Sequence, residues 1–287
     1  MRRKAHPMSV PHTSRRISRI LTYLAVIFML ACMLSPLFWL LRVSLDENLF
    51  DHPAALWPPA DSIGFSAYRT VFGEPYVINW YLNSIYVTGL TLLVTIPIST
   101  MAGYALSRYR RKETVAISGL ILLARMLPMS LLVIPLYVLF SKIGILNNPI
   151  CLVLANTTFA IPFCVWLLKG FFDALPTELE EAAEVDGCGL WGSFLRITLP
   201  LALPGIAAAA TYLSVVSWSE YIFARTFMTH PRTWTLAVGA IAFRQQYLAN
   251  WNTIAAASLV FMVPLLILFA FLQRYLVQGL SAGAVKG

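Results

Sequence analysis

Long stretches without any charged residue constrain this chain more than any other feature of its sequence. Each reaches or exceeds the ~20 apolar residues that an α-helix needs to cross the hydrocarbon core of a bilayer. A further stretch, 117–140, is interrupted only by Arg125. Continuous apolar runs exclude a transmembrane β-barrel, whose strands are alternating segments of ~10 residues. The uncharged stretches cover residues 20–41, 75–107, 143–168, 197–219 and 245–273.

These runs predict an all-α integral membrane protein with six transmembrane helices. Charged residues make up only 12% of the 287 residues, whereas a soluble domain contains roughly 25%. The predicted helices, numbered here as spans 1 to 6, lie near residues 20–42, 84–107, 116–140, 150–172, 201–223 and 255–277.

Lysine and arginine residues are distributed unequally between the two sides of these spans. With the N-terminus in the cytoplasm, the cytoplasmic segments hold 14 of the 21, the outside segments hold six, and Arg125 lies within span 3. Because positive residues favour the cytoplasmic side, both termini are predicted to be cytoplasmic. The net charge of +8 follows from this topology and from attraction to lipid, and it requires no nucleic acid partner.

The spans divide the chain into four segments. Residues 1–19 form a basic cytoplasmic tail, and the apolar run after it is too long for the 7–15-residue core of a signal peptide. Residues 20–83 contain the first transmembrane helix and an extracytoplasmic loop. Residues 84–277 form the transmembrane core, and residues 278–287 form a cytoplasmic C-terminal tail.

The loop between spans 4 and 5 contains a short acidic segment that we expect to be helical. Thr177 and Glu180 have the spacing of a capping box, so the helix is expected to begin near Glu178. Gly187 suits its end, because glycine adopts the left-handed conformation without steric strain. Pro200 is expected to keep the residue before it out of helical geometry and so to separate the loop from span 5. One face carries an acidic row that is available to arginines of a soluble partner; it consists of Glu178, Glu181 and Glu184.

This loop resembles the EAA loop of permease subunits in binding-protein-dependent ABC importers. In that motif the letters EAA are followed by a glycine and then by I-x-L-P, and the complete spaced set is present here. The matching residues are Glu181, Ala182, Ala183, Gly187, Ile197, Leu199 and Pro200. Further segments between residues 70 and 287, including the C-terminal one from Gln273, resemble the maltose-type carbohydrate permeases.

The resemblance implies a permease subunit in the cytoplasmic (inner) membrane of a bacterium, forming half of the translocation pathway for a sugar or polyol. As partners it implies a second permease subunit of a different chain, two ATP-binding cassette subunits and an extracytoplasmic solute-binding protein, all besides the lipid bilayer. The EAA loop would couple the chain to the ATPase, which would bind ATP and magnesium. The sequence does not identify the sugar.

Motifs for catalysis or nucleotide binding are absent from the sequence. No G-x-x-x-x-G-K-[ST] loop occurs, so ATP hydrolysis is expected in a separate subunit. No H-E-x-x-H or G-x-S-x-G motif and no paired His or Cys cluster occurs either. The chain is therefore expected to be a non-catalytic subunit without catalytic, cofactor-binding or metal-binding residues.

A few polar and aromatic residues in the predicted spans are candidates for the substrate pathway. Ionisable residues at membrane depth are energetically unfavourable and mark functional sites by default. Carboxylates accept hydrogen bonds from sugar hydroxyls, and aromatic rings cover sugar C–H faces. Helix packing and interfacial anchoring explain the same residues equally well, so both interpretations stay open. The candidates are Arg125, Asn156, Trp218, Glu220 and Tyr221.

An ion-coupled secondary transporter of small polar solutes is the main alternative function. It would need coupling acids buried at mid-span, and often paired repeats with broken helices. Glu220 alone, near the outer boundary of span 5, supports it poorly. A membrane-embedded enzyme is a second alternative, which the missing catalytic motifs argue against. An ATPase that co-purifies with the chain would favour the importer, and a proton- or sodium-dependent flux through this chain alone would favour the secondary transporter.

Overall fold

The computed structural model describes residues 12–51, 55–109, 112–247 and 250–284, with the backbone alone for 12–18, 125 and 275–284. Residues 1–11 of the predicted basic tail and residues 285–287 of the predicted C-terminal tail lie outside this part. The described chain is helical apart from its loops and an isolated β-bridge between Asp46 and Ile63. The predicted all-α class is therefore confirmed.

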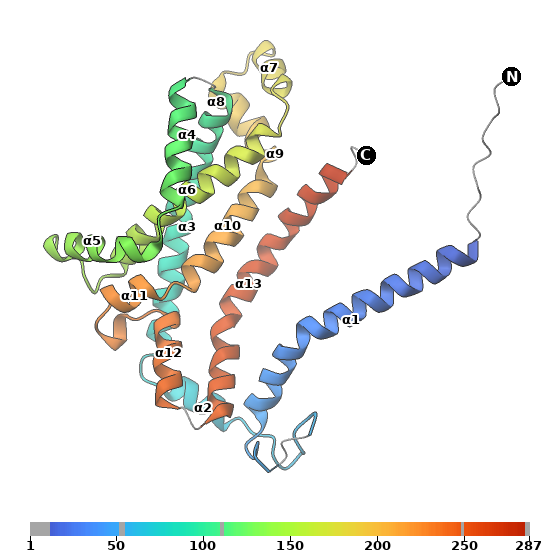
Figure 1. The fold of residues 1–287 in the computed structure, drawn as a ribbon, viewed down its shortest axis with the longest axis vertical. Coiled ribbons are helices and arrows are strands. Elements are labelled where there is room, and N and C mark those ends of the chain that lie inside the picture. Colours follow the sequence, from blue (N-terminus) through green and yellow to red (C-terminus); the bar gives the residue numbers. More distant parts are fainter. Residues whose placement is uncertain (1–11, 52–54, 110–111, 248–249, 285–287) are drawn as a thin grey trace.

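The helices follow one another as Figure 1 shows. They are α1 (His12–Leu45), α2 (Ser66–Gly73), α3 (Val77–Arg108), α4 (Lys112–Arg125), α5 (Met129–Lys142), α6 (Pro149–Asp173), α7 (Glu178–Val185), α8 (Leu190–Ser193), a π-helix (Phe194–Thr198), α9 (Leu199–Leu201), α10 (Leu203–Trp218), α11 (Ile222–Phe227), a 3-10 helix (Pro231–Thr233), α12 (Leu236–Gln246) and α13 (Trp251–Ala284).

Four helices of the described chain are individually long and apolar enough to cross a membrane, and they coincide with spans 1, 2, 4 and 6. They are Arg19–Leu45 of α1, α3, α6 and Trp251–Arg274 of α13. The start of α3 differs from the prediction, since α3 begins at Val77 and not near residue 84. Val77 and Trp80 are buried in a cluster with residues of α12 and α13, and this packing extends the helix by about two turns. The predicted extracytoplasmic loop also contains α2, whose Ala67 and Val71 join the same cluster.

Span 3 is not the continuous helix over 116–140 that the sequence predicts. The axes of α4 and α5 meet at an angle of 93°. Pro128 comes directly before α5 in an extended conformation, with φ −68° and ψ 139°. Proline lacks a backbone N–H and disfavours helical geometry in the residue before it, which permits the break. As a result α5 projects to one side of the bundle, roughly perpendicular to α4, and packs on α11 (Figure 1).

Span 5 is broken as well, so the predicted continuous helix over 201–223 is wrong. The segment Leu190–Leu201 meets α10 at 68°, and α10 ends at Trp218. Leu199 is helical with φ −64° and ψ −45°, so Pro200 does not have the expected effect on the residue before it. The expected separation of the loop from span 5 occurs instead as the bend at Ala202. Pro200 lies in α9 directly after the π-helix, and the N–H of Leu199 before it donates to the carbonyl of Phe194.

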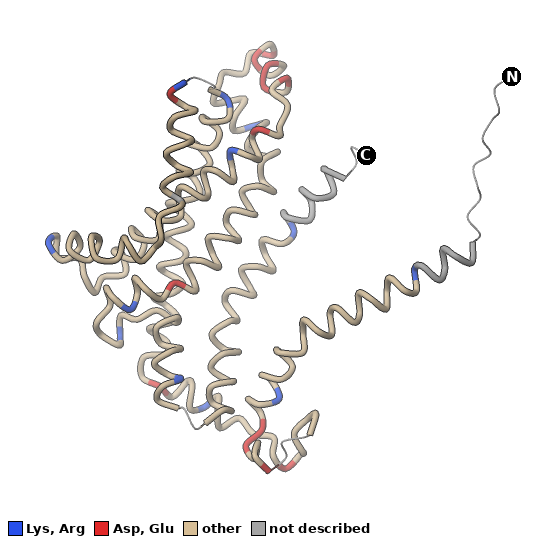
Figure 2. Tube along the Cα trace, in the orientation of Figure 1, with Lys and Arg blue, Asp and Glu red and all other residues tan. Residues whose placement is uncertain are grey.

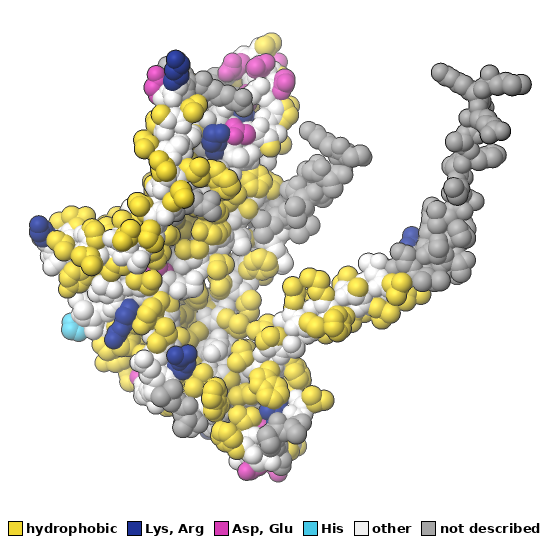
Figure 3. All heavy atoms as spheres, viewed as in Figure 1, with side chains coloured by type: hydrophobic (Ala, Val, Ile, Leu, Met, Phe, Trp, Pro, Cys, Tyr) yellow, Lys and Arg dark blue, Asp and Glu magenta, His cyan; other side chains and the backbone are white. Residues whose placement is uncertain are grey.

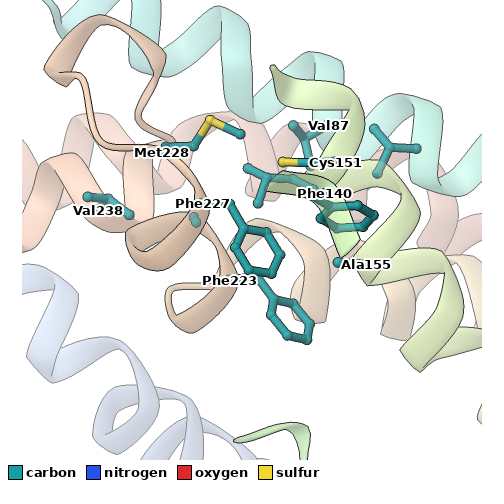
Figure 4. Close-up of a cluster of buried hydrophobic side chains, with 11 residues drawn as sticks. Val87, Phe140, Cys151, Ala155, Phe223, Phe227, Met228 and Val238 are labelled. Atoms are coloured by element: carbon teal, nitrogen blue, oxygen red, sulfur yellow. The ribbon is translucent and has the colours of Figure 1, made fainter. Parts of the chain in front are cut away.

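A cluster of buried hydrophobic side chains joins the two broken spans (Figure 4). Phe223 and Phe227 of α11 stack with ring centroids 5.5 Å apart, and Phe140 of α5 meets Phe227 edge-on at 5.4 Å. Cys151 and Ala155 of α6 belong to the same cluster. Because these residues come from distant parts of the sequence, their burial fixes α5 and α11 against the long helix α6.

The surface of the bundle is apolar in its middle and charged towards its ends. Figure 2 shows uncharged middle parts of α1, α3, α10 and α13, and an acidic group on α7 at one end of the molecule. Hydrophobic side chains cover the visible faces of α1, α4 and α5 (Figure 3). None of the residues 19–41 of α1 is buried. Such a surface suits immersion in a bilayer and contact with other apolar helices.

Helix α3 lies close against α6 because Gly103 has no side chain. A Cβ atom at this position would lie 3.0 Å from the backbone nitrogen of Lys169 and 3.1 Å from Cβ of Leu168. Small residues let transmembrane helices approach in this way. Gly89 on the same helix would meet nothing within 4 Å, so it provides a matched comparison.

We expect Gly103→Ala to destabilise the protein by about 1–3 kcal/mol, because the added methyl group forces the backbones of α3 and α6 apart. Gly89→Ala should be neutral or slightly stabilising, since alanine favours helix by about 1 kcal/mol over glycine. Thermal unfolding of the purified variants in detergent measures both effects. Equal melting temperatures for the two variants would contradict the close contact at Gly103.

Candidate functional site

Helix α7 stands at one end of the bundle, between the ends of α6 and α8 (Figure 1). It begins at Glu178, as the sequence predicts. Its end is a Schellman motif, in which the N–H of Cys188 donates to the carbonyl of Ala183 at 2.9 Å and the N–H of Gly187 donates to that of Glu184 at 3.0 Å. Gly187 has φ +84°, the left-handed conformation expected of it.

The two faces of α7 have opposite surroundings. Ala183 is only 4% exposed, and α7 packs on α8 and on the π-helix of the same loop. Ala182 and Val185 are exposed, the latter to 88%. The acidic row that the sequence predicts is exposed throughout; it consists of Glu178, Glu181 and Glu184. Helix α7 thus presents an acidic face with an apolar residue beside it to the outside of the molecule.

The predicted capping box does not form. Thr177 makes no side-chain hydrogen bond at the start of α7, and its backbone is already helical. Glu180 turns instead towards the last turns of α3. Its Oε1 accepts from Nε of Arg108 at 2.8 Å and lies 2.7 Å from Nη2, and its Oε2 accepts from the hydroxyl of Tyr104 at 2.7 Å. A tertiary partner with a full charge outcompetes the neutral backbone N–H that a capping box would use.

The remaining residues of the EAA motif connect the loop to the bundle. Ile197 lies half-buried in the π-helix, and Pro200 is exposed in α9. Leu199 packs against a buried cluster that includes Tyr104 and Phe194. The ring centroids of Tyr104 and Phe194 are 4.6 Å apart. Ile197 and Leu199 are therefore partly covered by the bundle, whereas Pro200 stays exposed.

The candidate pathway residues lie away from α7, and most of them are near the end of α10. Nδ2 of Asn156 donates to Oγ of Ser217 at 3.2 Å, which brings α6 against the residue before Trp218. Trp218 and Tyr221 are half-buried. Arg125 is the last residue of α4, and its side chain lies outside the described residues.

Glu220 lies two residues before α11 and caps the start of this helix, a role that sequence reasoning missed. Its Oε1 accepts from the backbone N–H of Phe223 at 2.7 Å and its Oε2 from that of Ala224 at 2.9 Å. The first N–H groups of a helix have no intrahelical partner, and inside a membrane no bulk water is available to them. Glu220 is only 5% exposed, and its carboxylate provides hydrogen-bond acceptors for these N–H groups just after the end of α10.

Sequence reasoning also missed the contacts that Tyr104 and Arg108 make with Glu180. Arg108 was counted only as one of the basic residues that orient the chain. Its Nη1 donates to the carbonyl of Phe172 at 2.9 Å and its Nη2 to that of Leu175 at 3.4 Å. Their spacing could have indicated a shared role. Tyr104 and Arg108 are four residues apart in the last turns of span 2, which places both side chains on one face of the helix.

The surroundings of Glu180 set its charge. Burial acts to raise the pKa of this carboxyl, but hydrogen bonds from Arg108 and Tyr104, together with the charge of Arg108, outweigh burial and hold the pKa below the ordinary value of 4.5. Glu180 therefore contributes stability that is fully present above pH 4.5 and is lost as the pH falls through the lowered pKa.

Comparison with known proteins assigns the larger part of the chain to one family. Residues 95–282 match the model of the family described as binding-protein-dependent transport system inner membrane component. The sulfoquinovosyl glycerol transport system permease protein SmoH of Agrobacterium fabrum is 32% identical over 93% of this chain and 94% of its own. The maltodextrin transport system permease protein MdxG of Bacillus subtilis is 31% identical over 96% and 99%.

A third relative is the melibiose/raffinose/stachyose import permease protein MelC of Bacillus subtilis, 33% identical over 94% of this chain and 97% of its own. The crystal structure of a bacterial ABC transporter involved in the import of the acidic polysaccharide alginate contains a chain of the same fold. That chain has a TM-score of 0.73 and 20% sequence identity, with 93% of this chain and 99% of the other covered.

We expect Glu180→Gln to lower the free energy of unfolding by about 2 kcal/mol at neutral pH, because it removes a charged acceptor of two side chains. The melting temperatures of wild type and variant should converge as the pH falls below 4.5, since wild type then loses the same charge. Thermal unfolding in detergent between pH 7 and pH 3 measures this; glutamine at the exposed Glu178 is the matched control, with little effect at any pH. A difference for Glu180→Gln that does not change with pH would contradict the assignment.

Proposed function

The chain belongs to the family of inner-membrane components of binding-protein-dependent transport systems, and we propose from this premise that it carries a sugar or polyol through an ATP-driven importer. As the permease subunit it forms half of the translocation pathway, and hydrolysis of ATP with magnesium takes place in a separate ATPase. The observation that carries the coupling role is α7, an eight-residue helix with an exposed acidic face and a tight glycine turn after it.

The exposed face of α7 has the chemistry of a docking surface. Its carboxylates complement a basic cleft, and charge complementarity of this kind guides and specifies association. Large apolar side chains lie beside them without cover from the rest of the chain. They are Leu179, Val185, Leu190 and Trp191. A cleft of the ATPase with basic residues and an apolar floor would bury both kinds of side chain.

Six spans result if each bent pair crosses the membrane once, as α4 with α5 and α8–α9 with α10. Four long helices and two bent ones then give an even number of crossings. Both termini and the α7 loop lie in the cytoplasm on this topology, as the lysine and arginine distribution favours. The loops around α2 and α12 lie on the opposite, extracytoplasmic side, where a solute-binding protein docks.

The substrate class rests on the relatives, whose names specify maltodextrin, melibiose and a sulfoquinovosyl glycerol. The residues that we place along the pathway are Arg125, Asn156, Trp218, Glu220 and Tyr221. In the structure, Asn156 and Glu220 are held in place by Ser217 and by the start of α11. These bonds fix the shape of the break after α10, and the half-buried rings of Trp218 and Tyr221 adjoin it.

The assembly consists of this chain, a second permease subunit of a different sequence, two ATP-binding cassette subunits and the binding protein. The unburied apolar length of α1 and the outer faces of α4 and α5 supply the surface that a second permease and lipid cover. The ion-coupled alternative is not favoured, because the family imports with a binding protein.

We expect Gly187→Val to disrupt the end of α7, because a β-branched residue tolerates φ +84° badly. Valine at Gly189, which has φ −71° and no neighbour within 4 Å of an added Cβ, is the matched control. Recovery of the ATPase with the tagged permease should fall for the first variant and stay near wild type for the second. Equal recovery of the ATPase with both variants would show that the turn at Gly187 is not needed for docking.

Glu181→Lys should weaken the same association, because repulsion replaces attraction where close charge pairs couple by several kcal/mol. Lysine at the exposed Glu113 in the first turn of α4 makes the same charge change away from α7 and serves as control. Both variants should insert normally, and sugar uptake in cells should fall only for Glu181→Lys. Normal uptake and ATPase recovery for Glu181→Lys would show that the acidic face does not dock.

Cysteine labelling tests the topology. In a variant without native cysteines, a cysteine at Thr177 should react only after the cytoplasmic side is opened. Cysteines at Asp61 and at the exposed His230 should react from the outside of intact cells. Reaction of Thr177→Cys from outside would overturn the topology and the docking role together.

A further inference from the structure

The last two turns of α3 hold α7 and the end of α6 at the same time. We propose that Tyr104 and Arg108, named here the α3 clamp, make α7 move as one body with α3 and α6 when the ATPase displaces it. This inference rests on the proposed coupling function and adds the residues that pass the motion of α7 to the membrane helices. Tyr104 and Arg108 are thus positioning residues, which act on transport through the pose of α7.

The guanidinium of Arg108 is shared between two elements. Two of its nitrogens meet one carboxylate oxygen of Glu180, at 2.8 and 2.7 Å. Its Nη1 donates at 2.9 Å to the carbonyl of Phe172 in the last turn of α6, which also accepts from the backbone N–H of Leu175 at 3.1 Å. The rigid planar fork of arginine suits such simultaneous contacts, whereas a lysine ammonium would not reach both.

Tyr104 adds a second connection from the same face of α3. Its hydroxyl donates to the other oxygen of Glu180 at 2.7 Å, so both carboxylate oxygens are engaged by α3. Its ring meets Phe172 of α6 edge-on at 5.5 Å and Phe194 of the π-helix at 4.6 Å. One side chain therefore contacts α6, α7 and the segment that leads into α10.

The clamp is shielded from water, unlike the rest of the acidic residues on α7. The side chains of Arg108 and Glu180 are 12% and 13% exposed. Surface ion pairs contribute little because water and salt screen them, whereas removal of one partner of a buried pair is strongly unfavourable. The difference follows from the partners, because Glu180 contacts Tyr104 and Arg108 of α3 whereas Glu181 and Glu184 are exposed.

The contact between α3 and α6 has its own polar link, which does not involve α7. Oγ of Ser107 donates to Oδ1 of Asp173 at 2.7 Å, and Gly103 lets the two helices approach closely. Loss of the bonds to Glu180 would therefore release α7 and leave α3 packed on α6. This separation makes the clamp testable with a folded protein.

Hydrogen exchange read by mass spectrometry on the complete purified transporter tests the inference without knowledge of the sugar. The probe is magnesium ATP with orthovanadate, which traps the ATPase, compared with the nucleotide-free complex. In wild type, α7 and the last turns of α3 and α6 should change protection together. In Glu180→Gln, α7 should exchange at least about fivefold faster than in wild type, and trapping should no longer change the ends of α3 and α6.

Two further variants make the test specific. Tyr104→Phe keeps the ring and the ion pair but removes one hydrogen bond, and it should give a smaller effect in the same direction. Lys169→Gln removes the exposed pair with Asp173 on the same end of α6, 2.6 Å apart, and should behave as wild type. A merely structural role of Glu180 would lower protection equally in α7 and in the rest of the bundle, and it would leave the joint response intact.

Joint changes of wild-type size in both Glu180→Gln and Tyr104→Phe would overturn the clamp. A loss of protection of equal size in α7 and in the rest of the bundle would overturn it too, because Glu180 would then contribute to overall stability alone. The proposed function is judged separately: it fails if the wild-type chain recovers no ATPase, whereas the clamp fails if wild type couples and the variants respond as wild type does.

Discussion

The close contact between α3 and α6 is the interaction on which the other elements depend. It exists because Gly103 leaves room for the backbone of α6, where a Cβ atom would lie 3.0 Å from the nitrogen of Lys169. Helix α10 packs on both partners, and the rings of Tyr104 and Phe172 close the end of the contact at 5.5 Å. Arg108 reaches the carbonyls at the end of α6 only because the two helices end side by side. The pose of α7 follows from this pair, since the carboxylate of Glu180 meets side chains that α3 presents there.

Irregular backbone near membrane depth is the second constraint, because free N–H and C=O groups need partners in a bilayer. At the end of α10 the carboxylate of Glu220 satisfies the first N–H groups of α11. Asn147, whose φ is +63°, accepts at Oδ1 from the backbone N–H of Thr229 at 2.7 Å and so ties the turn before α6 to the loop after α11. Each bend in the bundle is thus accompanied by a side chain that replaces a lost helical hydrogen bond or by a buried apolar cluster.

Hydropathy was sufficient to predict the long helices and insufficient to predict where two of them break. Proline content does not resolve this, because Pro36, Pro97, Pro135, Pro162 and Pro264 all lie inside continuous helices. Only tertiary packing distinguishes Pro128, where α5 leaves the axis of α4 to bury Phe140 against α11. Glu180 shows the same limit at a single residue. Its spacing from Thr177 predicts a local cap, but Arg108, 72 residues earlier in the chain, provides a charged partner that no local pattern reveals.

The start of α7, its glycine turn and its exposed acidic face could be predicted from sequence, because each follows from a local physical rule. Gly187 has the positive φ that a glycine at a helix end favours. The exposed glutamates share a face because of their helical spacing alone. The contacts of the inner side of α7 cannot be predicted from local sequence, because they are made with α3 and with the π-helix. A helix of eight residues buries too little surface to hold its own position. Its orientation therefore depends on Glu180 and on the packing of Ala183, and these are the contacts through which we propose that a force on the outer face reaches the membrane helices.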